Sequence, residues 1–383
     1  MSITHPKGFK ASGVAAGLKQ NGLDVALVLN DGPDATVAGV FTANRVKAAP
    51  VVWSQQVVRG GVVRAVVLNS GGANACTGHQ GFQDTHATAE HVASVLGGLG
   101  AGDVAVCSTG LIGELLPMDK LIPGVTAAAK ALDKDGGLAA AEAIMTTDTR
   151  PKTAVAAGAG WSVGGMAKGA GMLAPGLATM LSVLTTDAVA DSVALDAALR
   201  EACRVTFDRV DSDGCMSTND TVLLLANGAS GIAPSQEELT AAVTAACHEL
   251  AQQLISDAEG ATKQVAIEVV GAASDGDAVE VGRSVARNNL VKTALFGNDP
   301  NWGRILAAVG TTAAAFEPDA LDVAVNGVWV CKGGAAAADR STVDLAGRDV
   351  TIRIDLHAGS AEATIWTNDL SHAYVHENSA YST

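Results

Sequence analysis

Aromatic side chains are scarce in this sequence, although hydrophobic residues as a whole are not. Phe, Trp and Tyr make up 3% of the 383 residues, whereas hydrophobic residues make up 48%. The chain therefore has enough apolar side chains for sizeable cores, and Ala, Val and Leu must fill them. Its length predicts two or three domains, and its 43 glycines predict many tight turns and close backbone contacts.

Positive charge and long apolar runs are also in short supply. The chain carries 25 Lys and Arg against 40 Asp and Glu, a net charge of −15. This balance disfavours nucleic acid and anionic membrane surfaces as partners. No run is apolar and long enough to span a bilayer, and the start, MSITHPKGFKASG, lacks the apolar segment of a signal peptide. We expect a cytoplasmic protein that acts on small molecules.

Paired metal ligands are missing as well. The six cysteines include no C-x-x-C pair, so no structural zinc site is expected. We expect all six to be small buried hydrophobes in a reducing compartment: Cys76, Cys107, Cys203, Cys215, Cys247 and Cys331. His372 and His376 have metal-pair spacing but lack a third ligand, and Tyr374 and Val375 between them are typical of a strand. The acidic loop 208–220 lacks the terminal Glu of an EF-hand.

Strand and helix patterns alternate along the chain, which is typical of a layered α/β protein. In the first part, strands are expected at 25–30, 37–41, 63–69 and 104–108, and helices at 85–96, 117–132 and 137–144. A strand or hairpin is expected within 158–168. Further on, we expect a helix at 191–205, a strand at 221–226 and a long helix at 235–257.

From about residue 264 the pattern changes and predicts a smaller C-terminal α/β domain over 264–383. A strand at 264–270 is followed by a helix at 277–289, which places Arg283 and Arg287 on one face. Three more strands are expected at 323–331, 350–356 and 363–367.

The segment 168–181, KGAGMLAPGLATML, organises the chain. Small residues crowd it up to Ala178, and a buried strand pattern begins just after Thr179. At such a junction the Thr179 hydroxyl can attack the preceding carbonyl of Ala178, because small residues leave room for a strained turn. Hydrolysis of the resulting ester would leave Thr179 with a free amine that can serve as the base for its own hydroxyl. The alternative is an ordinary buried threonine on a strand.

Other polar residues stand where chemistry is possible. Thr109 and Gly110 follow the strand at 104–108 and could stabilise an oxyanion, or simply end the strand. Lys168 is the only cation in 158–168 and could hold a substrate carboxylate, or be a solvated loop lysine. Glu259, at the end of the long helix, could accept a substrate ammonium, or be a surface residue.

Two more polar stretches have mainly structural interpretations. Thr146, on its own, is typical of the capping at a helix end. The Gly-rich loop 69–74 fits neither a dinucleotide fingerprint nor a P-loop, so a tight structural turn is expected there.

Nine segments in order resemble the ornithine acetyltransferase family (glutamate N-acetyltransferase, of arginine biosynthesis), and together they span essentially the whole chain. They are PKGFKASGVAAGLK (6–19), LNSGGANACTG (68–78), STGLIGE (108–114), MTTDT (145–149), KGAGMLAPGLATML (168–181), DRVDSDGCMSTND (208–220), DAEGATK (257–263), FGNDPNWGRI (296–305) and HENSAYST (376–383).

The resemblance implies a layered αββα sandwich of the N-terminal-nucleophile type that cleaves itself between Ala178 and Thr179. The products would be an α chain of residues 1–178 and a β chain of residues 179–383, associated as α2β2 or a larger assembly. Thr179 would take the acetyl group from N2-acetylornithine and pass it to L-glutamate, with Thr109 and Gly110 as the oxyanion hole.

The resemblance also implies which residues hold the amino-acid part shared by both substrates, and that no cofactor is required. These residues are Thr146, Lys168, Thr179, Glu259, Asn378 and Thr383.

Whether acetyl-CoA is a second donor stays open, as does a role in a secondary ornithine-related pathway. Two rival functions remain: an amidohydrolase or aminopeptidase with the same nucleophile and water as acceptor, and an uncleaved protein without enzymatic activity.

Overall fold

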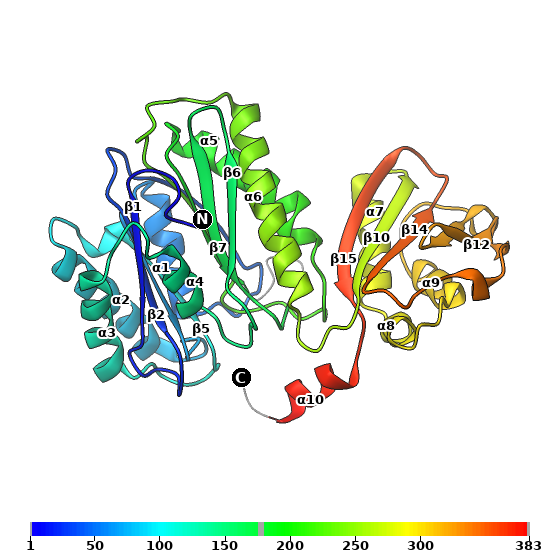
Figure 1. Ribbon diagram of the computed structural model, residues 1–383, viewed down its shortest axis with the longest axis horizontal. Coiled ribbons are helices and arrows are strands. Elements are labelled where there is room, and N and C mark those ends of the chain that lie inside the picture. Colours follow the sequence, from blue (N-terminus) through cyan, green and yellow to red (C-terminus); the bar gives the residue numbers. More distant parts are fainter. Residues whose placement is uncertain (1, 175–179, 381–383) are drawn as a thin grey trace.

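Two β-sheets packed face to face form the main body in the computed structural model, which describes residues 2–174 and 180–380 (Figure 1). The first sheet has the order β1-β2-β4-β5, with β1 Phe9–Val14, β2 Val25–Asn30, β4 Ala65–Ser70 and β5 Val104–Thr109. The second has the order β3-β9-β8-β7-β6, with β3 Thr36–Phe41, β9 Thr221–Ala226, β8 Leu181–Thr186, β7 Ser162–Lys168 and β6 Lys152–Ala157. Neighbouring strands are antiparallel except for the parallel pairs β4–β5 and β8–β9.

Helices cover the outer face of each sheet, which gives an αββα sandwich. Leu68 points into the core between the sheets, where it joins Met166 and Leu223. Its neighbour Val67 points the other way, because successive side chains of a strand alternate, and packs in the core under α2 Gly78–Leu96 and α3 Met118–Lys130. On the second sheet, α5 Ser192–Val205 and α6 Gln236–Ser256 enclose a similar core. The expected layering is confirmed.

Smaller elements complete the main body. Helix α1 Ala49–Arg59 packs on β5, and α4 Gly137–Ala143 packs on β1 and β2. The sequence pattern placed α3, α4, α5 and α6 to within a few residues. A strand or hairpin was expected within 158–168, and the structure has the strand β7 there, paired antiparallel with β6, which precedes that range.

A third sheet with its own core is built from the C-terminal part of the chain, and we refer to this unit as the C-terminal domain. Its order is β13-β12-β11-β14-β10-β15, with β10 Gln264–Ala272, β11 Asp322–Val325, β12 Val328–Lys332, β13 Ala335–Ala336, β14 Asp349–Asp355 and β15 Ala361–Asn368. One face packs against α7 Asp275–Ala286, α8 Asn289–Phe296 and α9 Trp302–Val309. The other face is turned toward the main body, where Trp366 of β15 packs edge-on against His248 of α6 at a ring distance of 5.2 Å (Figure 1).

Three expectations are corrected by the structure. The single strand expected at 323–331 is a hairpin, because Asn326 and Gly327 adopt positive φ angles of 47° and 81° and turn the chain. Tyr374 and Val375 lie in a helix, α10 His372–Ala380, and not in a strand. Four cysteines are buried as expected, but Cys76 and Cys215 are exposed. Among the described residues, no helix is both long and apolar enough to cross a membrane.

Candidate active site

Six of the residues singled out in the sequence line one cavity of about 100 Å3. They are Thr109, Gly110, Thr146, Lys168, Glu259 and Asn378. Gly171 and Met172, from the segment 168–181, line it as well. Ala178, Thr179 and Thr383 lie outside the described residues. The cavity therefore gathers parts of the chain that are far apart in sequence, from Ala73 after β4 to Asn378 in the C-terminal helix.

Thr109 and Gly110 stand at the carboxyl end of β5, where the Gly-rich loop 69–74 backs them. The Gly72 N–H donates to the Thr109 carbonyl at 3.0 Å. Gly110 has a φ of +131°, and a Cβ there would lie 2.5 Å from the Gly72 nitrogen. Glycine is required at position 110 on both counts. The loop thus has the structural function that its sequence suggested, and it shapes one wall of the cavity.

Lys168 is buried, at 2% exposure, so the interpretation as a solvated loop lysine is wrong. Its Nζ donates to the Thr109 hydroxyl oxygen at 3.2 Å. Because an ammonium group can only donate, this bond uses a lone pair of Thr109 and leaves the hydroxyl proton free to be donated elsewhere. Burial lowers the pKa of Lys168, and the negative charge of Asp148 is the main opposing influence.

A buried ion-pair triad holds two walls of the cavity in place. The Nζ of Lys152, fully buried, lies 2.5 Å from an oxygen of Asp148 and 2.6 Å from an oxygen of Asp257. Asp148 also accepts hydrogen bonds from the N–H groups of Gly169, at 2.7 Å, and Thr146, at 3.0 Å. Burial raises the pKa of Asp148, but Lys168 and Lys152 outweigh it and the net shift is downward. An ionised Asp148 thus ties the Thr146 turn to the end of β7.

The C-terminal helix α10 follows β15 and extends below the two parts of the molecule (Figure 1), and its Asn378 lines the cavity. Asn378 Nδ2 donates to a Glu259 carboxylate oxygen at 2.9 Å and to the Tyr374 carbonyl at 3.0 Å. Glu259 is anchored through its own N–H, which donates to the Ala170 carbonyl at 3.0 Å. A Cβ on Gly171 would lie 2.7 Å from the Glu259 carboxylate, so glycine at that position makes room for the acid. Glu259 is therefore a constrained cavity residue and not a free surface side chain.

Asp220 was missed as an individual candidate in the sequence, where it is one of several acids in a polar loop. It is fully buried, and one carboxylate oxygen accepts the N–H of Met180 at 3.1 Å. The other oxygen is buried and has no hydrogen-bond partner among the described residues. Burial raises the pKa of Asp220 well above 3.8, against the opposing effects of the Met180 N–H and Lys168. Only the tertiary structure identifies Asp220 as a candidate, because what distinguishes it is its burial beside Met180, the residue that follows Thr179.

Asn219 was also missed, and it attaches the same loop to the end of β5. Its Nδ2 donates to the carbonyls of Ala73, at 2.6 Å, and Ser108, at 2.8 Å. The loop acids are engaged by the chain itself: Asp213, for example, accepts the N–H groups of Cys215, within the loop, and of Met172, in the segment 168–181. Within the ranges 2–174 and 180–380, no group of three or more His, Cys, Asp or Glu side chains is placed to hold a metal ion.

A protein-family comparison matches residues 10–383 to the ArgJ family. The arginine biosynthesis bifunctional protein ArgJ of Streptomyces avermitilis is 69% identical over 383 residues, and the match covers 100% of both chains. The protein of the same name from Streptomyces coelicolor is 66% identical, again over 100% of both chains.

Two solved structures are also similar. One is the ornithine acetyltransferase complexed with ornithine from Mycobacterium tuberculosis, 57% identical with a TM-score of 0.45, covering 47% of this chain and 96% of that chain. The other is the arginine biosynthesis bifunctional protein ArgJ of Bacillus halodurans, 33% identical with a TM-score of 0.48, covering 51% of this chain and 97% of that chain.

Proposed function

Because the chain belongs to the ArgJ family, we infer that it is an acyltransferase of arginine biosynthesis that moves an acetyl group from N2-acetylornithine to L-glutamate. The observation that carries the inference for this chain is the convergence of six residues, distant in sequence, on one small cavity beside the segment 168–181. Family membership favours transfer to glutamate over hydrolysis by water with the same nucleophile.

We propose that the nucleophile forms by cleavage of the peptide bond between Ala178 and Thr179. The Thr179 hydroxyl attacks the Ala178 carbonyl, the peptide becomes an ester, and water hydrolyses it to leave a free α-amine on Thr179. The α chain of 1–178 and the β chain of 179–383 would stay together, because β7 of the first is hydrogen-bonded to β8 of the second. In this pair Lys168 lies opposite Leu181 and Val163 lies opposite Thr186. One sheet is thus built from both chains.

In the first half-reaction, the amine of Thr179 takes the proton of its own hydroxyl, whose oxygen attacks the acetyl carbonyl of N2-acetylornithine. The oxyanion that forms would accept hydrogen bonds from the Thr109 hydroxyl and the Gly110 N–H. The free proton on Thr109 supports this role, since Lys168 occupies a lone pair of the same oxygen. The C–N bond then breaks, the leaving amine takes the proton, and acetyl-Thr179 remains.

In the second half-reaction, the amine of glutamate attacks the ester carbonyl of acetyl-Thr179 and leaves as N-acetylglutamate, while Thr179 recovers its proton. Lys168 would hold the substrate carboxylate and Glu259 a substrate ammonium, as their charges allow. Thr146, Asn378 and Thr383 would complete the binding of the shared amino-acid part. An ester intermediate requires that water be kept away, so we propose that the bound substrate fills this cavity of about 100 Å3.

Three finer features are part of the same proposal. The two chains would associate as α2β2 or a larger assembly, in the cytoplasm, without nucleic acid or membrane as partners. Acetyl-CoA is a candidate second acetyl donor, and supplying it in place of acetylornithine tests this. No cofactor is needed for the steps above, because the attacking oxygen, the base and the oxyanion donors all come from the chain itself.

The intact mass of the purified, denatured protein tests the mechanism. We expect two fragments that divide between Ala178 and Thr179 and whose masses sum to the full chain plus one water. Thr179→Ser keeps a hydroxyl and should still be cleaved, whereas Thr179→Ala should give one full-length mass and no activity. A single full-length mass in active wild-type enzyme would overturn the mechanism.

Label in the acetyl group of acetylornithine should appear in N-acetylglutamate, and its release as acetate would indicate a hydrolase instead.

A further inference from the structure

A second, larger cavity of about 600 Å3 lies where the main body meets the C-terminal domain, and four arginines line it. Arg204 comes from α5, Arg209 from the short 3-10 helix Phe207–Arg209, and Arg283 and Arg287 from one face of α7. The chain as a whole carries a net charge of −15, so this is an unusual concentration of positive charge. Among the described residues, its lining shares none with the active-site cavity.

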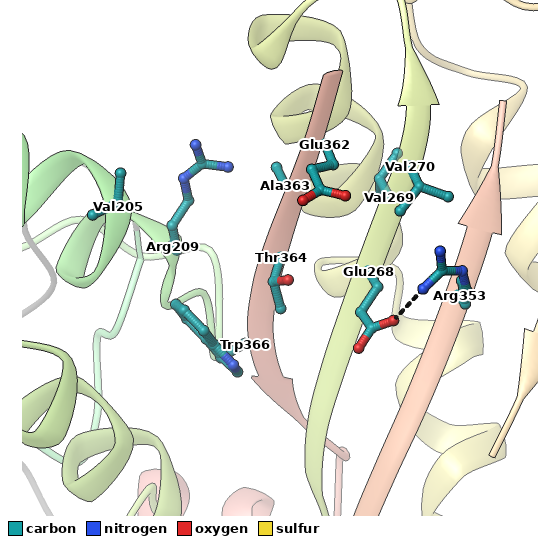
Figure 2. Close-up of a pocket in the computed structure, with 10 residues that line it drawn as sticks. All are labelled: Val205, Arg209, Glu268, Val269, Val270, Arg353, Glu362, Ala363, Thr364 and Trp366. Atoms are coloured by element: carbon teal, nitrogen blue, oxygen red, sulfur yellow. Dashed lines mark hydrogen bonds and ion pairs between the residues drawn. The ribbon is translucent and has the colours of Figure 1, made fainter. Parts of the chain in front are cut away.

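Arg209 is buried, at 7% exposure, and its hydrogen bonding is incomplete. Its Nε donates to the Arg204 carbonyl at 3.1 Å, but its buried Nη1 has no partner within the described part of the chain. Figure 2 shows Arg209 beside Val205, facing β15 across an adjoining cavity of about 440 Å3. The Arg209 guanidinium therefore lies at the boundary of two cavities. Its Nη1 group has no hydrogen-bond acceptor in the described part of the chain.

Arg283 has a similar deficit. Its Nη2 donates to the Asp208 carbonyl at 2.9 Å, while its Nε is buried and has no partner among residues 2–174 and 180–380. Burial lowers the pKa of both Arg209 and Arg283. The positive charges of Arg204 and Arg283 further lower that of Arg209, while nearby acids, Asp208 among them, oppose the shift of both groups. Buried N–H groups of charged side chains are costly to leave without an acceptor. An anion between the two guanidinium groups would satisfy both donors and relieve their repulsion.

Acidic side chains also line this cavity, and several are already engaged. Asp275 lies 3.5 Å from the Arg204 guanidinium, and Glu280 accepts the N–H of Ala313 at 2.8 Å. Asp208 is the third acid of the lining, which leaves four arginines against three acids. Asp211 and Glu201, just outside the lining, pair with Arg287 and Arg204, so the cluster as a whole is not positive. The argument for a ligand therefore rests on the unsatisfied N–H groups of Arg209 and Arg283.

The outer arginines are fixed by ion pairs with acids of the main body. Arg287 Nε lies 2.6 Å from Asp211, and Arg204 lies 2.8 Å from Glu201. The cluster is thus held in position before any ligand arrives.

We propose that this cavity binds a phosphate group, either free or carried by a small molecule. Arg209 and Arg283 would be direct donors, and the exposed Arg204 would be a third positive charge at the ligand. The planar guanidinium fork matches the oxygens of a phosphate, and several arginines suit a ligand with more than one negative charge. The volume is that of ordinary small-molecule sites, which often lie between domains. The site is independent of acetyl transfer, since it uses other residues in another cavity.

Calorimetric titration of the full-length, self-processed protein with inorganic phosphate, at constant ionic strength, tests the proposal. We expect saturable binding and a melting temperature that rises with phosphate concentration. Arg204→Gln and Arg209→Lys should each weaken binding by about tenfold or more, because they remove charge or the guanidinium fork. Arg200→Gln, one turn earlier on α5 and paired with Asp196, does not line the cavity and is the matched control.

A second titration with coenzyme A distinguishes the two sources of phosphate. If the same two variants weaken binding of coenzyme A, the phosphate is carried by a nucleotide-type molecule; if they affect inorganic phosphate alone, the ligand is the free ion. Arg204 is exposed, so its variant should fold even if Arg209→Lys does not. Absence of saturable phosphate binding in the wild type, or equal affinities in the wild type, Arg204→Gln and Arg200→Gln, would overturn the proposal.

Discussion

Replacing Gly171 with alanine tests the function of Glu259 without changing any charge. A Cβ at position 171 would lie 2.7 Å from the Glu259 carboxylate, whereas ordinary contacts begin at 3.4 Å. The carboxylate must therefore retreat by up to roughly 1 Å, which also disturbs its hydrogen bond with Asn378. The backbone at Gly171 is outside the left-handed region, so alanine fits the local conformation.

The expected magnitude follows from the contact that the carboxylate would lose. A charge-assisted hydrogen bond contributes about 1.5–3 kcal/mol, and a misplacement of about 1 Å can cost a hundredfold in rate. We expect kcat/KM to fall by about 10- to 100-fold for acetylornithine. Stability should be unchanged or slightly higher, since Glu259 is a flexible side chain and alanine restricts the unfolded chain.

Steady-state kinetics and thermal unfolding of the same samples provide the measurement. Gly303→Ala on α9 is the matched control, because its Cβ would have only an ordinary contact of 3.6 Å with Asn301. In a Glu259→Gln background, Gly171→Ala should add little, since both changes remove the same interaction. If Gly171→Ala leaves kcat/KM within about twofold of the wild type, Glu259 does not hold the substrate and the reasoning is refuted.

Three further changes probe the neighbouring groups. Thr109→Val should lower kcat by about 10²- to 10³-fold through loss of an oxyanion donor, whereas Thr109→Ser should keep most activity; a change in KM alone would contradict this. Lys152→Met leaves two buried carboxylates without their cation, so the free energy of unfolding measured in urea should fall by about 3–5 kcal/mol. Lys10→Met is the control and should be nearly neutral, because the ion pair of Lys10 with Asp31 is exposed. Asp220→Asn should gain stability relative to the wild type as the pH rises above 3.8. Burial raises the pKa of Asp220, so over that range the native state keeps a proton that the unfolded chain has released, and wild-type stability falls. A stability difference that stays constant from about pH 4 to pH 8 would contradict this account.

Local patterns in the sequence were sufficient to predict a layered α/β protein, whereas the αββα order was implied by the family resemblance. Runs such as 25–28 and 65–68 are apolar at successive positions, and the structure buries them on both faces, between a second sheet and a layer of helices. The start of α6 was evident from Ser235, whose side chain forms a capping box with Glu238. The hairpin at Asn326 and Gly327 was overlooked, although Asn-Gly is a hairpin signal. These features depend on side chains within a few residues of one another.

The sequence by itself also determined the chemistry available at each position: a hydroxyl at Thr179, an ammonium at Lys168, a carboxylate at Glu259. Whether those groups meet was decided only by the tertiary structure. Glu259 and Asn378 are 119 residues apart and share a hydrogen bond. Asp220 is buried just before β9, where it accepts the N–H groups of Thr42 and Met180 from distant parts of the chain. The physical reason is range. Backbone preferences and hydrophobic periodicity act over a few residues, whereas burial, pKa and hydrogen-bond partners are properties of the packed chain.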